Sequence, residues 1–476
     1  MLGAIAAGAA AVMIERAGVS PRLLEPYIER HTSGHHPLIE ATGRHVATLL
    51  VWLDRGSLQP RLDWPAWALP RSSVSAPRQA SAGREVLVAD NSQLVAALAQ
   101  AQPGDAIRIA PGTYRFSGRS LRAERPGRAE APITVTAAVP GSVTLEFDLL
   151  EGFLVAAPHW IFEQLTIAGV CRNDDDCEHA FHVVADADHV TIRDNELRDF
   201  NAHLKINGAG GQFPDHGMVS GNRIFNTRAR RTDRPVTLID LVAASGWRIE
   251  GNLIADFVKA GGNATSYGAF AKGAGTDNRF ERNVVLCEHR LRGAAGRRIG
   301  RSFGGGGTGK EVCRDRRCTV EHERGVIENN LIASCSDVGI YLNRAAQSVV
   351  RHNTLIDAAG IQASSAETAA RVEGNLLDAD LWFRHGAILR AADNRSTPQT
   401  LRYLGLSGAG RSFMDAATLD LRWRNEPERR VLAAGESSSV DLCGQVRPDR
   451  VAYGAFEDIR RCEQDAHSRR AATADR

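Results

Sequence analysis

The chain has 476 residues, of which 43% are hydrophobic, and its formal net charge is +2. This length and composition allow a large buried core and exclude a chain that is disordered by composition. The near-neutral charge argues against a general nucleic-acid-binding protein, so no nucleic-acid partner is predicted. Glycine, with 45 residues, outnumbers proline, with 18, and aromatic residues are sparse, which favours strands and turns over a helical bundle.

The N-terminal segment is uncharged from residue 2 to residue 14 and consists mostly of alanine, glycine and aliphatic residues. Its length suits the apolar region of a signal peptide, although a basic start and a clear cleavage motif are missing. It is too short to span a bilayer alone. We therefore expect residues 1–18 to form an export signal or a membrane anchor of a periplasmic or secreted protein, with a plain alanine-rich helix as the alternative.

Residues 19–84 combine amphipathic stretches with a linker that contains proline and serine, "LPRSSVSAPRQASAG". The pattern predicts two or three short helices followed by an irregular connection. We assign no chemistry to this segment. It is expected either to tether the rest of the chain to a membrane or to lie against the N-terminal end of the next domain.

The eight cysteines predict disulfides. The close pairs lack the C-x-x-C spacing of zinc knuckles and redox sites, and an even count suits an oxidising compartment. Eight reduced thiols in a cytosolic protein are the alternative. The expected pairs are Cys171 with Cys177, Cys313 with Cys318, Cys443 with Cys462 and, between stacked turns, Cys287 with Cys335.

One short pattern recurs along the middle of the chain. An aliphatic or aromatic residue precedes an asparagine by two or three positions, and another aliphatic residue follows it two positions later. The asparagines are separated by 27, 30, 31, 47, 23 and 22 residues. Short strands separated by such turn residues predict the stacked coils of a β-solenoid, with the asparagines hydrogen-bonding along the stack. They are Asn195, Asn222, Asn252, Asn283, Asn330, Asn353 and Asn375.

This pattern resembles the right-handed parallel β-helix of the pectate-lyase superfamily over about residues 85–395. The stretch "EVLVADNSQLVAALAQAQPGDAIRIAPGTYR" looks like the strand, short helix and strand with which many such proteins begin. A helix there would cover the open end of the solenoid. The resemblance implies an all-β fold with a short helical N-terminal segment. "VRPDRVAYGAFED" is similar to the closing segment of such proteins, and residues 396–476 form a C-terminal extension.

The enlarged coils lie between about residues 195 and 330. Insertions in a solenoid usually build its binding face. The four lysines of the chain, at positions 205, 259, 272 and 310, all fall in this window, among 58 lysines and arginines. Residues 279–324 hold 12 basic against 6 acidic residues. We therefore expect a cationic groove for an acidic polysaccharide, with a solvated basic loop as the alternative.

Lys272 is the candidate catalytic base. Lyases and epimerases that act on uronates remove the proton at C5, and lysine can supply a neutral amine for this step, whereas arginine stays protonated. "FAKGAGTDNRFERN" and "GRRIGRSFGGG" resemble the lysine and arginine rungs of the chondroitinase B and alginate lyase group. This resemblance implies that Lys272 is the base and Arg301 the proton donor. A structural lysine paired with Asp277 or Glu281 is the alternative.

Other polar residues are secondary candidates. Alternation predicts that His203 and Lys205 point to one face of a strand, although single histidines on strands are more often structural. Loops beside the glycine run supply His289 and His322. The expected catalytic set is Lys272, Arg301, His289 and Lys205, and the expected substrate-binding set is His203, Arg298, Lys310 and His322.

No residue is assigned as a metal ligand. The resembled group places carboxylates before its lysine to hold calcium, and the corresponding "GGNATSYGA" has none. The run "NDDDCE" is either another source of calcium ligands or a solvated hairpin. "GGGGTGKE" begins like a phosphate-binding loop, but Glu311 stands where serine or threonine would bind magnesium. We expect a mobile glycine-rich loop over the groove.

Two classes of function fit these patterns. The first is an exported enzyme that acts on an acidic polysaccharide by β-elimination or C5 epimerisation, which the confined lysines and enlarged coils favour. The second is a non-catalytic envelope or polysaccharide-binding protein, which the missing calcium carboxylates favour. The paired aspartates of a polygalacturonase-type hydrolase are not apparent, so hydrolysis ranks below elimination.

Overall fold

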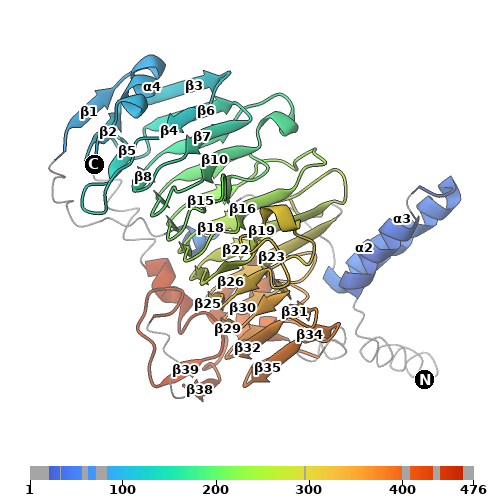
Figure 1. The fold of residues 1–476 in the computed structure, drawn as a ribbon. Helices are drawn as coiled ribbons and strands as arrows, with labels where there is room; N and C mark the ends of the chain where they lie inside the picture. The colour runs from blue at the N-terminus through green and yellow to red at the C-terminus, as the bar shows by residue number, and fades with distance from the viewer. Residues whose placement is uncertain are drawn as a thin grey trace, which may run out of the picture.

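A computed structural model describes residues 21–32, 34–55, 63–70, 83–293, 296–398, 408–432 and 440–464. Within them, the chain winds through three long parallel sheets that run side by side along a solenoid (Figure 1). Each coil contributes one strand to sheet A, then one to sheet B and one to sheet C. This is the expected right-handed parallel β-helix, and the prediction of parallel strands between about residues 105 and 395 is confirmed.

The strands of the three sheets have the following bounds. Sheet A contains β1 (Glu85–Val88), β2 (Ala106–Ile109), β5 (Ile133–Ala137), β8 (Trp160–Glu163), β11 (Thr191–Arg193), β14 (Met218–Ser220), β17 (Arg248–Glu250), β21 (Arg279–Glu281), β25 (Val326–Glu328), β29 (Ser348–Arg351), β32 (Ala369–Glu373) and β35 (Ile388–Ala392). Sheet B contains β3 (Gly112–Ser117), β6 (Val143–Asp148), β9 (Thr166–Gly169), β12 (Glu196–Arg198), β15 (Arg223–Phe225), β18 (Leu253–Ala255), β22 (Val284–Leu286), β26 (Leu331–Ala333), β30 (Thr354–Ile356) and β33 (Leu376–Leu377). Sheet C contains β4 (Leu121–Ala123), β7 (Glu151–Val155), β10 (His179–Val184), β13 (Leu204–Asn207), β16 (Val236–Val242), β19 (Thr265–Lys272), β23 (Arg297–Phe303), β27 (Ile340–Asn343), β31 (Ile361–Ser364) and β34 (Leu381–Arg384).

The core lies inside the solenoid, where each strand turns every second side chain inward. Aligned strands therefore place similar side chains above one another in columns. A single coil would bury too little apolar surface to be stable by itself. One such buried column in sheet A consists of Ile192, Val219, Ile249, Phe280, Ile327, Val350 and Val372. Helix α4 (Asn91–Ala99) adds Leu94 and Leu98 to the same core at the N-terminal end.

The recurring asparagines form one continuous ladder at the corner between sheets A and B. In each step the side-chain amide and the backbone N–H of one asparagine donate to the side-chain oxygen of the next, at 2.9–3.1 Å. Asn394 continues the ladder beyond Asn375. Their structural role is confirmed, because a buried primary amide needs partners for both its donors and its acceptor.

All eight cysteines are paired, as the sequence predicts. Cys171–Cys177 and Cys313–Cys318 close short loops, and Cys443–Cys462 lies in the C-terminal extension. Cys287–Cys335 joins two neighbouring coils. Four disulfides indicate that the protein resides in an oxidising compartment.

The C-terminal extension covers the outer face of sheet B. It contains two antiparallel pairs, β36 (Phe413–Asp415) with β37 (Asp420–Trp423) and β38 (Arg429–Val431) with β39 (Arg450–Ala452). Apolar side chains of the extension, such as Leu421 and Phe456, pack in one cluster with outward residues of sheet B. The outer face of sheet B is therefore covered by described chain from β15 to β33. Short 3-10 turns complete the extension and the loops: η1 (Ala66–Ala68), η2 (Asp174–Asp176), η3 (Lys310–Val312), η4 (Ala409–Ser412) and η5 (Ala416–Thr418).

Two helices precede the solenoid, α2 (Pro21–Thr32) and α3 (Pro37–Arg55), and they form a hairpin that projects from its side (Figure 1). Arg22 anchors the base of the hairpin: its buried guanidinium binds Asp54 at 2.5 Å, Asp357 at 2.7 Å and the Cys335 carbonyl at 3.0 Å. These two carboxylates outweigh the effect of burial and raise the arginine's pKa. Among the described helices, none has the length and apolar character needed to cross a membrane. Residues 1–18, the expected signal or anchor, lie outside the described part of the chain.

Candidate functional site

A cleft of about 480 Å³ lies on the outer face of sheet C, within the enlarged coils. Its size falls in the range of about 300–1,000 Å³ that is usual for ligand sites. Strands β16 and β19 form the floor, and the glycine-rich loop after β23 forms one wall. The lining residues are Asp233, Pro235, Val236, Thr237, Asp240, Lys259, Asn263, Thr265, Tyr267, Phe270, Lys272, Gly305, Gly307 and Thr308.

Charged residues of three successive coils meet at the floor. Lys205 on β13 is in register with Asp240 on β16, and its ammonium lies 2.6 Å from the Asp240 carboxylate. Lys272, at the end of β19, has its ammonium 4.8 Å from the centre of the Phe270 ring. Burial would raise the pKa of Asp240, but Lys205 and Lys272 outweigh it and hold the pKa below its usual range. The floor thus carries two cations around one carboxylate.

Lys272 differs from the other two cleft lysines in its contacts. Lys205 is paired with Asp240, and Lys259 donates to the Asp233 carbonyl at 3.0 Å. The ammonium of Lys272 has no hydrogen bond or ion pair with any residue in the described part of the chain. The alternative pairings with Asp277 and Glu281 are not formed, and these carboxylates bind Arg324 and Arg279. The Lys272 ammonium is therefore available to a ligand in the cleft.

His182 extends the polar floor towards the N-terminal end of sheet C. It lies on β10 in register with Lys205. One ring nitrogen is 2.8 Å from Glu151 on β7 and the other is 2.8 Å from Asn207 on β13. The sequence reasoning missed this histidine because its partners come from coils 25 and 31 residues away. The period-two alternation of "HAFHVV" was the available signal.

The glycine-rich loop is held over the cleft by a buried carboxylate. Glu321 accepts hydrogen bonds from the Gly305 N–H at 2.8 Å and from the Thr308 hydroxyl at 2.7 Å. Farther along, Arg314 donates to Asp215 at 2.6 Å and thereby fixes the disulfide-closed end of the loop to an earlier coil. Lys310 is exposed on η3, outside the lining of the cleft.

Arg301, the expected proton donor, points into the solenoid instead of the cleft. It pairs in register with Ala269 and Ile340, both core residues, and its guanidinium stacks 4.9 Å from the centre of the Phe280 ring. None of its guanidinium nitrogens has a hydrogen-bond partner among the described residues. Burial lowers the pKa of Arg301 to about 9. The resemblance placed it one strand along from Lys272, but strand alternation turns the two side chains to opposite faces.

Four more of the expected site residues are buried away from the cleft. Arg298 forms an ion pair with Glu288 at 2.7 Å, with both side chains excluded from solvent. His289 donates to the Asp63 carbonyl at 2.7 Å. His203 donates to the Phe225 carbonyl at 2.9 Å, so it does not share a face with Lys205. His322 accepts from Asn278 at 3.1 Å and stacks on Phe303, with ring centres 4.1 Å apart.

The two buried histidines predict a pH dependence of stability. Burial lowers the pKa of His203 and of His322 to about 3, whereas an unfolded histidine titrates near 6.5. Between these values the unfolded chain binds more protons, so stability is full above about pH 6.5 and falls as the pH decreases. Each histidine contributes up to about 1.4 kcal/mol per pH unit.

This dependence can be measured as the melting temperature between pH 7 and pH 5, a window in which most carboxylates stay ionised. His203→Gln keeps a donor for the Phe225 carbonyl. This variant should show a smaller change of melting temperature with pH than the wild type. The exposed His216 provides the matched control, because His216→Gln should leave the slope unchanged. A melting temperature that stays constant across this window would contradict the buried, neutral state of His203.

No group of three or more potential ligands has a metal-binding arrangement within the described ranges. In the "NDDDCE" run, Asp174 binds Arg228 at 2.5 Å, Asp175 accepts from Thr232, and Glu178 binds Arg234. These acids therefore hold the connection between β9 and β10 against the connection between β15 and β16, two coils further along.

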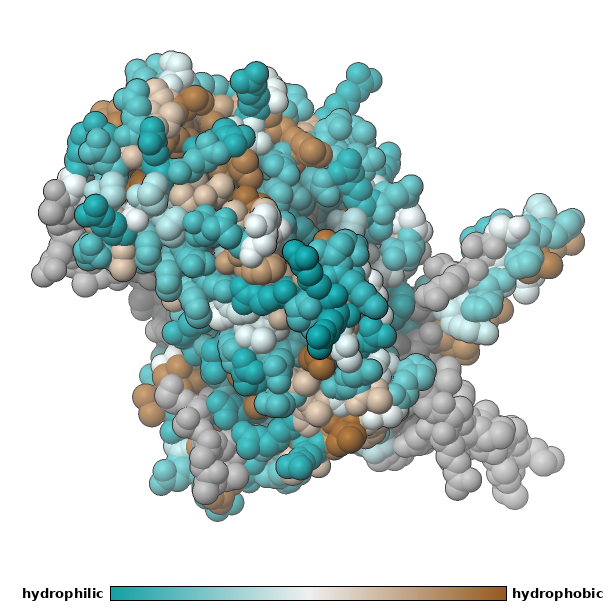
Figure 2. Space-filling view, in the orientation of Figure 1, coloured by the Kyte–Doolittle hydropathy of each residue, from teal (hydrophilic) through white to brown (hydrophobic). Residues whose placement is uncertain are grey.

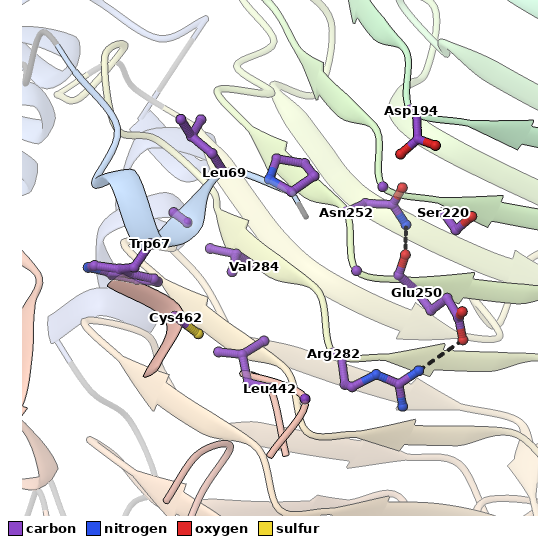
Figure 3. Close-up of a pocket in the computed structure, with 15 residues that line it drawn as sticks. Trp67, Leu69, Asp194, Ser220, Glu250, Asn252, Arg282, Val284, Leu442 and Cys462 are labelled. Carbon is purple, nitrogen blue, oxygen red and sulfur yellow. Dashed lines mark hydrogen bonds and ion pairs between the residues drawn. The ribbon is translucent and has the colours of Figure 1, made fainter. Parts of the chain in front are cut away.

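A second, smaller pocket of about 200 Å³ lies at the corner between sheets A and B (Figure 3). Trp67 and Leu442 approach it from the N-terminal segment and the C-terminal extension. Arg282 reaches Glu250 at 3.0 Å on its floor, and Asn252 belongs to the asparagine ladder. Because this pocket is the smaller of the two and its arginine is already paired with Glu250, we place the candidate site in the cleft on sheet C.

No protein-family model matches the chain, and no curated protein sequence matches it. Among solved structures, the pectate lyase Pel9A is 15% identical with a TM-score of 0.49, and the match covers 80% of this chain and 98% of that chain. An alginate lyase from Paenibacillus sp. str. FPU-7 is 18% identical with a TM-score of 0.40, covering 59% of this chain and 95% of that chain. A GH136 lacto-N-biosidase from Eubacterium ramulus is 11% identical with a TM-score of 0.42, covering 65% and 67%. The strand register described above, not these similarities, establishes that the chain is a parallel β-helix.

Proposed function

We propose that the protein is an exported enzyme that acts on an acidic polysaccharide by β-elimination at a uronate, with C5 epimerisation as the closely related alternative. The observation that carries this proposal is the position of Lys272. Its ammonium faces a cleft of ligand size, beside the Lys205–Asp240 pair, and has no polar partner among the described residues. The amine of Lys272 is therefore in a position to act on a uronate bound in the cleft.

In this proposal, Lys205 and the neighbouring cations neutralise the uronate carboxylate, so that charge developing on the enolate is stabilised. Neutral Lys272 removes the C5 proton. The electron pair of that C–H bond forms the C4–C5 double bond as the bond from C4 to the glycosidic oxygen breaks.

The leaving oxygen needs a proton, and we assign this step to Tyr267. This residue lines the cleft on the same strand as Lys272, with Phe270 between them. Burial raises the pKa of Tyr267 to about 12, so the phenol keeps its proton near neutral pH. Arg301 could take this role only if its side chain left the solenoid core.

The direct test is an assay of the purified full chain on alginate, polygalacturonate and chondroitin. β-Elimination yields an unsaturated product that absorbs in the ultraviolet, and epimerisation changes the ratio of uronate epimers without chain cleavage. Either product supports the enzyme. Absence of both from all three polymers would refute the proposed reaction.

A second candidate function is a polysaccharide-binding protein without catalysis. The interior position of Arg301 favours it, because the lysine and arginine that the resemblance pairs are not brought together. This alternative predicts retention on an acidic polymer with no change in the polymer. The same incubation, followed by affinity electrophoresis, distinguishes the two functions.

The helical hairpin supports a further part of the proposal, attachment to a membrane surface. Leu38, Ile39, Val46, Leu49 and Trp52 follow helical spacing along one side of α3 and are exposed, Trp52 by 61%. Figure 2 shows apolar residues, coloured brown, on the surface of the hairpin. An amphipathic helix with an exposed tryptophan suits the bilayer interface, and the uncharged residues 2–14 lie next to it in the sequence.

We expect the full chain to sediment with phosphatidylglycerol vesicles. Leu49→Glu should weaken this association about tenfold or more, because burial of a leucine side chain contributes about 1.5–3 kcal/mol. Val139→Glu replaces an apolar residue of similar exposure on the solenoid and serves as the control. Equal sedimentation of both variants and the wild type would exclude α3 as the contact.

A further inference from the structure

The outer face of sheet C carries a column of side chains that starts at the cleft floor and runs towards the C-terminal end. Parallel register aligns these residues directly, one from each successive strand from β16 to β34. In order they are Asp240, Phe270, Ser302, Tyr341, Gln362 and Trp382. Polar and aromatic residues therefore alternate along the column.

The alternation sets a distance. Neighbouring strands of a sheet lie about 4.7–4.9 Å apart, so aromatic residues on every second strand recur at roughly 9–10 Å. This interval is about the length of two sugar units in an extended 1,4-linked chain. A linear polysaccharide that ran along the solenoid axis would thus pass one aromatic ring per disaccharide. Phe270 is reached only where it lines the cleft, Ser302 is fully buried, and Gln362 lies partly exposed between Tyr341 and Trp382.

The aromatic rings are held in position by neighbouring groups. The Trp382 indole N–H donates to the Ala359 carbonyl at 2.9 Å, and Asn343 donates to the Tyr341 hydroxyl at 2.8 Å. Phe270 packs edge-to-face against Tyr267, with ring centres 4.8 Å apart. Because these side chains are already ordered, a ligand would lose little affinity to fixing them.

Apolar residues beside the column form a cluster on the outside of the solenoid. Ile299, Val338 and Ala359 pack together with the rings of Tyr267 and Tyr341. The outward apolar residues of sheet B are covered by the C-terminal extension. On sheet C, Ile299, Val338 and Ala359 are buried, whereas Tyr341 and Trp382 remain partly exposed.

We propose that Phe270, Tyr341 and Trp382 form an aromatic track that binds a linear polysaccharide, two sugars per ring, along the solenoid axis from the cleft to the C-terminal end. The C–H faces of sugar rings stack on aromatic faces, and the intervening Gln362 and the cleft cations meet hydroxyl and carboxylate groups. The inference rests on the proposed function only in taking a polysaccharide as the ligand. The inference adds two points: affinity grows with the length of the polysaccharide, and the polysaccharide lies across the strands.

The test compares two probes, alginate polymer and a mannuronate disaccharide, on the full chain. Trp382→Ala and Tyr341→Ala should each weaken polymer binding by about three- to tenfold, the effect of losing one aromatic contact of about 0.5–1.5 kcal/mol. Disaccharide binding, confined to the cleft, should stay within twofold of the wild type. Isothermal titration for the disaccharide and affinity electrophoresis for the polymer provide the two readouts.

Phe383→Ala is the matched control, since Phe383 neighbours Trp382 on β34 and is 51% exposed, but pairs with Ala363 and so lies outside the column that contains Trp382. This variant should bind the polymer as the wild type does. Polymer binding that is unchanged in Trp382→Ala and Tyr341→Ala, or reduced equally in Phe383→Ala, would overturn the track.

The outcomes also separate the track from the reaction. A wild type that binds polymer in a Trp382-dependent way but releases no product supports the track and refutes the lyase. A wild type that cleaves polymer equally well after Trp382→Ala, with unchanged polymer affinity, supports the lyase and refutes the track. If alginate does not bind, the same comparison with polygalacturonate and then chondroitin decides, and no binding to any of the three polymers refutes both.

Discussion

Lys272→Arg should abolish formation of the unsaturated, ultraviolet-absorbing product while preserving most of the affinity for the acidic polymer. The substitution keeps the positive charge next to Asp240, so electrostatic attraction of a uronate is retained. Arginine stays protonated and cannot accept the C5 proton. General-base catalysis contributes about 10²- to 10⁴-fold, which sets the expected loss in turnover.

The chain offers a matched control for this substitution. Lys310→Arg makes the same chemical change at an exposed residue outside the cleft lining, so its activity should equal that of the wild type. Polymer affinity, measured by affinity electrophoresis, should be similar for all three proteins. If Lys272→Arg kept its activity within a few-fold, Lys272 would be a binding or structural residue and another base would be required.

The second large effect is a loss of stability on substitution of Arg298, and we expect no direct effect of this residue on substrate binding. Arg298 and Glu288 form an ion pair in which neither side chain reaches solvent. Removing one partner of such a pair leaves an uncompensated buried charge and costs about 3–5 kcal/mol. Arg298→Met should therefore lower the midpoint of urea unfolding strongly.

The double variant tests the cause of that loss. Replacing both charges by apolar groups of similar size is often neutral or stabilising, so Arg298→Met combined with Glu288→Met should regain most of the stability. A single variant that folds as stably as the wild type but shows a raised KM on the polymer would instead support the substrate-binding role that the sequence suggested. Circular dichroism and KM measurements on the same preparations separate the two outcomes.

The buried positions of Arg298 and Arg301 explain why the basic segment was a weaker guide to function than its charge suggested. The excess of basic residues between positions 279 and 324 is real. Several of these cations, however, serve internal contacts: Arg298 binds Glu288, and Arg314 binds Asp215. A count of charges along the sequence does not show which are neutralised by residues of other coils.

The lysines were a better guide, for a physical reason. Lys205 and Lys272 are separated by 67 residues, yet both occupy outward positions on sheet C and both lower the pKa of Asp240. In a solenoid, an insertion lengthens one coil without moving its strands out of the stack. Polar residues on outward positions of neighbouring strands therefore stay close however long the loops between them are.

The sequence by itself determined the fold, because the features that specify a solenoid are local and repeat. Each asparagine with its flanking aliphatic residues encodes one corner, and the spacing of the cysteines indicates which loops are closed. The tertiary structure alone decided which side chains share the cleft. That depends on the register between coils and on the face to which each side chain turns, and a shift of one residue along a strand exchanges the two faces. For this reason Asp240, His182 and the alternating Phe270, Tyr341 and Trp382 became visible only once the strands were aligned, while Arg301, one strand from Lys272, was turned into the core.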